Sequence, residues 1–202
     1  MTDGEEQEFG NNPSEPSIYF HHSDECGPVV YLLGLIALDW NYCEHLFSTL
    51  IWHYVGGHET GLSITPKMGN QTRADVLLDL ARKFEPDSGV LDRIQFARKA
   101  FNQLREVRNV LMHTHSIIPH ESGSYEWRRA STKAPTGHGA SLANLDELTQ
   151  TINAIGTLAM FILQIVLLHM AREKGDELPE LPEKFEMPKK LTQLPFEELP
   201  ED

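Results

Sequence analysis

The apolar residues of the segment 103–115 recur at helical spacing, and this repeat constrains the fold more than any other feature of the chain. Leu104, Val107 and Leu111 fall on one helical face and would point into a core. The repeat continues upstream through further apolar residues, so the spacing predicts one long helix over residues 88–118.

A polar row runs along the opposite face of this helix. Arg105, Asn109 and His113 are spaced four apart and therefore stack on one side. Arg108 adjoins the row, but His113 lies about 140° around the helix from it, taking about 100° per residue. Either the length of the arginine side chain or a second copy of the helix would be needed to bring Arg108 and His113 to one phosphate.

Arginine and histidine together suit the cleavage of RNA. An imidazole titrates near neutral pH and can take a proton from a 2′-hydroxyl or give one to the leaving oxygen. A guanidinium holds a phosphate through two hydrogen bonds and offsets the charge of the transition state. Asn109 could orient either group. On spacing alone, a polar helix face that meets solvent is the commoner arrangement.

The pattern Arg-Asn-x-x-x-His near the end of the third helix of an all-α domain resembles the HEPN superfamily, whose nuclease branch carries an Arg, four to six residues and then His. Arg108, Asn109 and His113 match those positions. The first helix, with the sequence ALDWNYCEHL over residues 37–46, is similar to the first helix of small bacterial relatives, in which a carboxylate (here Glu44) faces the motif. The resemblance covers about residues 29–171.

The resemblance implies a metal-independent endoribonuclease that works as a homodimer, with two motifs facing a shared cleft. His113 would act as general base or acid, Arg108 would bind and stabilise the scissile phosphate, Asn109 would orient both, and Glu44 would hold Arg108 or His113 in place. Supporting positions on the same helix are Arg105 and His115.

One branch of the superfamily is not matched. HEPN toxins that pair with nucleotidyltransferase antitoxins carry a Tyr two residues after the motif His, and here that position is His115. The sequence therefore leaves open whether the chain is a toxin, a defence effector or a housekeeping protein. An antitoxin or another regulatory protein is the partner to expect beside RNA.

The net charge of −13 argues against a nucleic-acid binder if the negative charge is spread over the whole chain, so its distribution matters. Residues 1–25 hold seven acidic and no basic residues, and residues 173–202 hold ten acidic and four basic. Residues 26–172 hold 13 of each sign, so this body is neutral and arginines on one face can still bind a phosphate backbone.

Capping signals and apolar spacing predict four helices, over residues 29–55, 72–84, 88–118 and 144–174. Thr72 with Asp75, and Asn144 with Glu147, have the spacing of capping boxes. Residues 58–69 contain Gly and Pro and are expected to form a loop.

The fourth predicted helix is apolar enough that a membrane span must be considered. A polar stripe along it favours a buried bundle helix instead, and we expect no membrane association; the stripe consists of Asp146, Gln150, Asn153, Thr157 and Gln164. Because this helix is the most apolar surface of the chain, it is also a candidate for dimer contact.

Alternating residues over 124–130 predict a short strand, as half of a hairpin, between the third and fourth helices. Trp127 with Arg128 and Arg129 could stack an RNA base and hold its phosphate. Burial of Trp127 over the end of the bundle is the favoured alternative, because large aromatic residues prefer burial.

We therefore expect an all-α, four-helix up-down bundle of HEPN type over residues 27–175 with a small β-hairpin or strand insertion. Acidic tails without fixed structure would flank it at 1–26 and 176–202. The absence of a secretory signal, two cysteines without a framework and no metal-ligand cluster predict a cytoplasmic protein without metal or other cofactor. The alternative function is a non-catalytic module of the same fold that binds a protein or a nucleotide.

Overall fold

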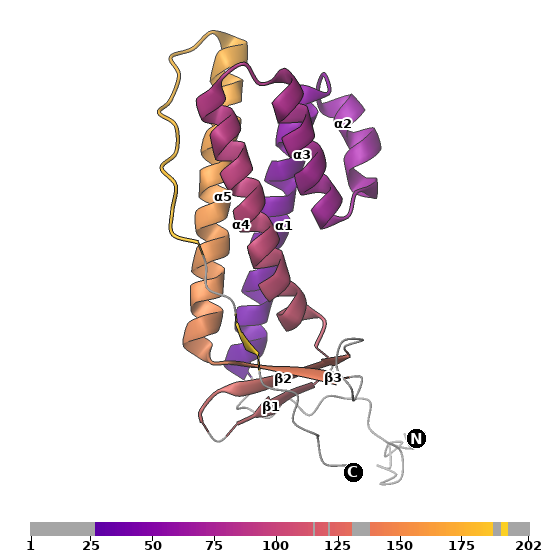
Figure 1. The fold of residues 1–202 in the computed structure, drawn as a ribbon, viewed down its shortest axis with the longest axis vertical. Helices are drawn as coiled ribbons and strands as arrows, with labels where there is room; N and C mark the ends of the chain where they lie inside the picture. Colours follow the sequence, from indigo (N-terminus) through magenta and orange to yellow (C-terminus); the bar gives the residue numbers. More distant parts are fainter. Residues whose placement is uncertain (1–26, 115, 121, 131–137, 188–190, 194–202) are drawn as a thin grey trace, which may run out of the picture.

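The computed structural model describes residues 27–114, 116–120, 122–130, 138–187 and 191–193. The chain is mainly helical with a small antiparallel sheet, as expected (Figure 1). The helices are α1 (Gly27–Tyr54), α2 (His58–Ile64), η2 (a 3-10 turn, Thr65–Lys67), α3 (Asn70–Phe84), α4 (Ser88–Met112) and α5 (Leu145–Lys174). The strands are β1 (Ser116–Pro119), β2 (Tyr125–Ala130), β3 (His138–Ala143) and β4 (Thr192–Gln193). The predicted N-terminal tail, residues 1–26, lies outside the described part.

The helix directions differ from the predicted up-down order. Helices α1 and α5 run parallel, as two contacts between them show. Cys43 in α1 contacts Ile155 in α5, and further along both helices His53, near the C-terminal end of α1, contacts Glu173, near the C-terminal end of α5. Only α4 runs antiparallel to the other three main helices (Figure 1). The reason lies in residues 58–69, where a loop was expected: α2 and η2 return the chain along α1, so α3 starts again in the direction of α1.

Two of the predicted helix boundaries are wrong. Helix α4 ends at Met112 instead of residue 118, because the chain turns at His113 and enters β1 three residues later. Helix α3 begins at Asn70, so Thr72 and Asp75 lie inside it and form no capping box. The Asp75 carboxylate instead accepts a hydrogen bond from Arg98 Nε at 2.7 Å.

The boundaries of α5 follow the sequence signals closely. Asn144 accepts a hydrogen bond from the Glu147 backbone N–H while the Glu147 carboxylate accepts one from the Asn144 backbone N–H, so the predicted capping box is present. Gly175 ends the helix with a left-handed backbone, at φ 71°. By length and composition α5 could cross a membrane, and half of its most apolar window is buried inside the protein.

The sheet covers the end of the bundle at which α4 finishes (Figure 1). Its four strands lie in the order β1-β2-β3-β4, and every neighbouring pair is antiparallel. Three strands therefore make up the insertion predicted between α4 and α5. The fourth, β4, comes from the C-terminal part of the chain and extends the sheet beside β3.

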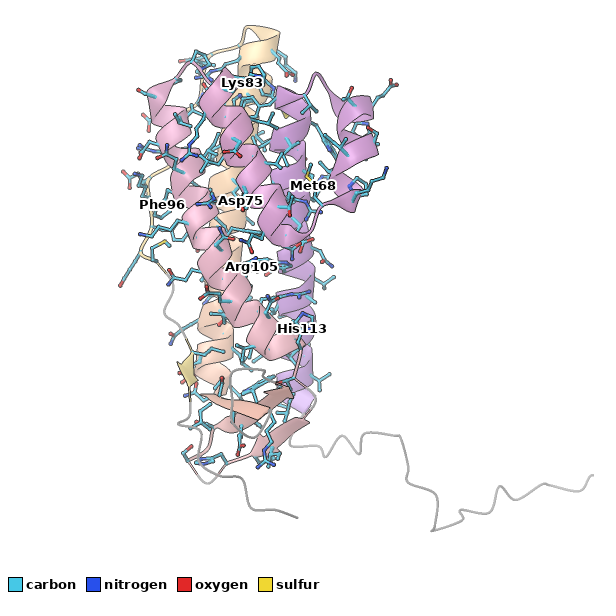
Figure 2. All side chains as sticks on the ribbon, turned by 45° about the vertical axis from the view of Figure 1, so that its right-hand side comes forward. Met68, Asp75, Lys83, Phe96, Arg105 and His113 are labelled. Carbon is cyan, nitrogen blue, oxygen red and sulfur yellow. The ribbon has the colours of Figure 1, made fainter. Side chains whose placement is uncertain are left out.

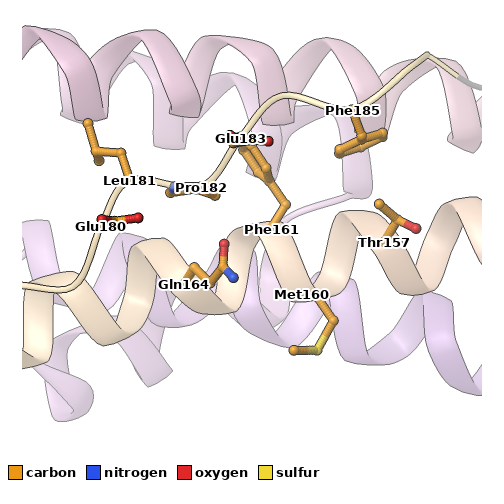
Figure 3. A pocket seen from close by; sticks show the side chains of 9 residues that line it. All are labelled: Thr157, Met160, Phe161, Gln164, Glu180, Leu181, Pro182, Glu183 and Phe185. Atoms are coloured by element: carbon orange, nitrogen blue, oxygen red, sulfur yellow. The ribbon is translucent and has the colours of Figure 1, made fainter.

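The C-terminal segment of residues 176–187, called the strap below, runs back along the bundle from the end of α5 (Figure 1). Pro182 is buried, and the ring of Phe185 lies beside that of Phe161 (Figure 3). The Phe185 ring also packs against Phe96. Arg93 Nε donates to the Pro182 carbonyl at 3.2 Å. The expectation that the C-terminal tail lacks fixed structure is thus wrong for the strap, because its apolar residues recur often enough to pack between α4 and α5.

Candidate functional site

The predicted motif lies at the C-terminal end of α4, next to the sheet (Figure 2). His113 is the first residue after the helix, and its backbone N–H still donates to the Asn109 carbonyl at 3.2 Å. Its backbone angles, φ −109° and ψ 18°, turn the chain away from the helix axis. His113 is exposed, whereas Arg108 and Asn109 are half-buried.

The Arg108 guanidinium bridges the other two residues of the motif. Its Nη1 lies 3.4 Å from His113 Nε2 and 3.3 Å from Asn109 Oδ1. Side-chain length and the turn at the helix end thus overcome the angular separation within one chain. Because a guanidinium can only donate, the contact requires an unprotonated Nε2 on His113, with the proton of the neutral imidazole on Nδ1.

Arg105 and Arg108 differ from the other described arginines in their partners. Six of the eight arginine side chains that the structure describes form ion pairs with carboxylates: Arg73, Arg82, Arg93, Arg98, Arg128 and Arg172. Among the described residues no carboxylate pairs with Arg105 or Arg108. Arg105 donates to the neutral Gln71 amide oxygen at 2.8 Å. The charges of this arginine pair are therefore not neutralised within the described part of the chain.

Glu44 does not hold the motif, which corrects the expectation for the first helix. Its Oε2 accepts a hydrogen bond from Arg73 Nη1 at 3.0 Å, and its Oε1 accepts one from Trp40 Nε1. The physical reason is that α3 lies beside this part of α1 and presents Arg73, whose side chain is 10% exposed, to the carboxylate. Glu44 joins two helices and contacts neither Arg108 nor His113.

Trp127 cannot stack an RNA base, because its side chain is fully buried. It projects from β2 into the core, as the alternative from the sequence proposed. Arg128 Nε pairs with Glu126 at 2.7 Å, and the side chain of Arg129 lies outside the described part of the chain. The predicted RNA-binding group on the insertion is therefore not assembled around Trp127. His115 also lies outside the described residues.

In the part of the chain that is described, no group of three or more His, Cys, Asp or Glu side chains is arranged to hold a metal ion. Cys43 is buried against α5, and burial raises the pKa of its thiol to about 12. The thiol is therefore protonated at neutral pH and is not a reactive nucleophile.

A second polar cluster, which sequence reasoning did not find, lies at the opposite end of the bundle. The Tyr54 hydroxyl donates to Glu85 Oε2 at 2.8 Å, and Arg172 Nη1 donates to Glu85 Oε1 at 2.8 Å. The Glu85 side chain is only 1% exposed, and burial acts to raise its pKa. The hydrogen bonds from Arg172, the Asp87 backbone N–H and Tyr54 outweigh burial and hold the pKa below its ordinary value. His169 Nε2 lies 3.2 Å from the Tyr54 oxygen. The cluster ties α1, the α3–α4 turn and α5 together.

Burial and the neighbouring His53 lower the pKa of His169 to about 4, so its imidazole is neutral in the folded protein. Since Tyr54 donates to Glu85, its oxygen accepts from His169 Nε2, which therefore carries the proton. The only signals in the sequence were a glutamate at a helix-helix turn and a histidine at the end of an apolar helix. Neither indicates that the two lie together.

Comparison of the chain with models of protein families, with curated proteins and with solved structures found no match.

Proposed function

We propose that the protein is a metal-independent endoribonuclease whose site is formed by Arg108, Asn109 and His113. The observation that carries the proposal is the contact between Arg108 Nη1 and His113 Nε2 at 3.4 Å. It brings a guanidinium and an imidazole together at an exposed helix end, and these are the groups that binding a phosphate and transferring a proton require. The two unneutralised arginines beside it, Arg105 and Arg108, suit the negative charge of RNA.

The chemistry follows from these two side chains. A phosphate that binds to the Arg108 guanidinium draws it away from His113, which frees the Nε2 lone pair. Nε2 then takes the proton of the 2′-hydroxyl, and the 2′-oxygen forms a bond to phosphorus while the bond from phosphorus to the 5′-oxygen breaks. The leaving oxygen takes a proton from solvent. The products are a 2′,3′-cyclic phosphate and a 5′-hydroxyl.

Arg108 would stabilise the negative charge that develops on the phosphoryl oxygens, and Asn109 would position the guanidinium through the hydrogen bond at 3.3 Å. Arg105, one turn earlier, would hold a neighbouring phosphate. His115, two residues beyond His113, remains a supporting candidate. Each role uses groups of this chain alone and needs no metal ion.

The proposal extends to a homodimer of HEPN type in the cytoplasm, with RNA as substrate and a regulatory protein such as an antitoxin as partner. Apolar side chains that remain exposed along α1 and α5 offer a surface for self-association: Tyr31, Leu38, Tyr42, Met160, Leu167 and Met170. The contact between Arg108 and His113 forms within one chain. Dimerisation would therefore shape the cleft without having to complete the catalytic pair.

The test is incubation of the pure protein with mixed RNA in the presence of EDTA, beside the variants His113→Ala and His120→Ala. His120 is a matched control, because it is an exposed histidine in the turn after β1. We expect the wild type and His120→Ala to cleave and His113→Ala to fail, with products that end in 2′,3′-cyclic phosphate or 3′-phosphate. Activity that EDTA abolishes and Mg²⁺ restores would refute the proposal.

The second candidate is a non-catalytic interaction module. The exposed apolar residues on α1 and α5 favour it, since such patches mark protein-binding surfaces. Intact RNA after prolonged incubation with the wild type, combined with a stable complex with a protein partner, would support this alternative.

A further inference from the structure

Neutral side chains hold both arginines of the polar row on α4. Arg108 Nη1 contacts the Asn109 side chain and His113. Arg105 Nη1 donates to the amide oxygen of Gln71 at 2.8 Å. The Nε atoms of both arginines are shielded from solvent and make no hydrogen bond to the described residues. Each guanidinium is therefore held by the protein and keeps its full positive charge for an anionic group.

The carboxylates on the neighbouring helices have arginines of their own. Glu44 on α1 pairs with Arg73 at 3.0 Å, and Asp75 on α3 pairs with Arg98 at 2.7 Å. A carboxylate at position 71 would pair with Arg105 in the same way and neutralise it. The glutamine at that position holds the guanidinium and leaves its charge available, which is what a phosphate site requires.

The contact with Gln71 places Arg105 at the junction of α3 and α4, because Gln71 belongs to the first turn of α3. Arg105 lies between Met68 and His113 along the bundle (Figure 2). Arg108 follows about 4.5 Å further along α4, at about 1.5 Å per residue, and contacts His113. The charged groups thus form a row that leads from the start of α3 to the histidine.

We propose that Gln71 positions Arg105 as a second phosphate subsite, so that a strand of RNA is held at two neighbouring phosphates. The scissile phosphate binds at Arg108 beside His113, and the neighbouring phosphate toward α3 binds at Arg105. The inference rests on the proposed function for cleavage at His113, whereas binding at the subsite requires only a strand with more than one phosphate.

The test compares three full-length variants at the start of α3. Gln71→Glu and Thr72→Glu each add one negative charge at neighbouring exposed positions of the first turn, so their effects on the helix dipole are alike. Only the first places a carboxylate on Arg105, because position 72 lies about 100° further around the helix. Gln71→Met removes the amide oxygen but leaves the charge of Arg105.

Binding is measured with a 2′-O-methyl RNA oligonucleotide, which has no free 2′-hydroxyl and cannot be cleaved. We expect Gln71→Glu to weaken binding by about fivefold to tenfold at low salt, Gln71→Met by less, and Thr72→Glu by about twofold at most. The slope of log affinity against log salt concentration should be smaller by about 0.7 in Gln71→Glu, the share of one phosphate on a single strand. Equal weakening by the two glutamates, an unchanged slope in Gln71→Glu or no binding by the wild type would overturn the proposal.

Cleavage separates the subsite from the catalytic pair. A dinucleoside monophosphate contains only the scissile phosphate, so Gln71→Glu should cleave it at the wild-type rate. On a longer oligonucleotide the same variant should raise KM and leave kcat unchanged. An equal loss on both substrates would place Arg105 at the scissile phosphate and refute a second subsite. If binding depends on position 71 as expected but the wild type cleaves neither substrate, the subsite stands and the nuclease does not.

Discussion

Glu44 Oε2 accepts a hydrogen bond from Arg73 Nη1 at 3.0 Å, and this pair joins α1 to α3. The side chains are 22% and 10% exposed, so the charges are largely shielded from water. Arg73 also donates to the backbone carbonyls of Thr65 and Met68, at 3.3 Å each. One guanidinium therefore fixes the chain reversal that sets the direction of α3.

Removal of the Arg73 charge should destabilise the protein without affecting the α4 motif. Arg73→Met leaves the Glu44 carboxylate without its ionic partner, and we expect a loss of about 3 kcal/mol in the free energy of unfolding. Arg98→Met is the matched control, since Arg98 pairs with Asp75 on the surface, and it should cost less than about 1 kcal/mol. Urea denaturation measures both. A similar, small loss in the two variants would contradict a structural role for the pair.

Periodicity predicted the helices because it records which side of a segment is apolar. It placed the α4 polar row, and the capping box and terminal glycine placed both ends of α5. The end of α4 was missed because apolar residues continue into β1, where Ile117 and Ile118 suit a strand as well as a helix. Helical spacing did not predict the contact between Arg108 and His113, because it placed the two residues about 140° apart; the length of the arginine side chain and the turn at His113 bring them together.

Partners from distant parts of the chain could not be anticipated in this way. Glu44 was expected to hold Arg108 or His113 on α4, but its partner is Arg73 on α3. Arg73 reaches Glu44 because α3 runs in the direction of α1, and that direction depends on the short helix within residues 58–69. The strap was missed for a similar reason. The acidic and proline-rich composition of the strap predicted a segment without fixed structure. Pro182 and Phe185 nevertheless pack against α4 and α5, and the sequence of the strap does not show that these two helices lie beside it.

The cluster around His169 should make the fold sensitive to acid. Its pKa of about 4 in the folded state lies below the ordinary value of 6.5, so between these values the unfolded chain binds a proton that the folded protein does not. The contribution of His169 to the free energy of unfolding is fully present above pH 6.5. It decreases as the pH is lowered to 4, by about 3 kcal/mol in total. The lowered pKa of Glu85 adds a further loss below its ordinary value of 4.5.

We therefore expect the melting temperature to decrease as the pH is lowered from 6.5 to 4. The variant His169→Gln should make the melting temperature less dependent on pH over this range. The control is His58→Gln at the same end of the bundle, because His58 is exposed and should leave the curve unchanged. A wild-type melting temperature that stays constant over this range would show that His169 titrates normally.

The strap should contribute to stability through Phe185. Phe185→Ala removes a ring that packs against Phe96 and Phe161, and we expect a loss of about 1–3 kcal/mol for a half-buried aromatic side chain. Phe84→Ala is the control, since Phe84 is 51% exposed and should change the free energy of unfolding little. Chemical denaturation compares the two, and equal losses would mean that the strap does not hold Phe185 in the aromatic cluster.

The chemistry of the α4 motif can be separated from its contribution to folding. Arg108→Lys keeps the charge but loses the planar fork that holds two phosphate oxygens, and His113→Asn keeps a polar side chain that cannot transfer a proton. Because Arg108 is half-buried and His113 exposed, each change should cost less than about 1 kcal/mol of stability. Each should lower the rate of RNA cleavage by about a hundredfold or more, whereas the controls Arg98→Lys and His120→Asn should cleave normally.

A mixture of these two variants tests whether the catalytic pair forms within one chain or across the proposed dimer. In a hybrid dimer, one subunit lacks the Arg108 guanidinium and the other lacks the His113 imidazole. Because Arg108 Nη1 and His113 Nε2 lie 3.4 Å apart in the same chain, neither subunit then holds a complete pair, and we expect no recovery of cleavage after the subunits exchange. In an equimolar mixture half of the dimers are hybrids, so recovery toward a quarter of the wild-type rate, one intact site in each hybrid, would instead place the arginine and the histidine of each site on different subunits. Wild-type rates in both single variants would remove the motif from catalysis altogether.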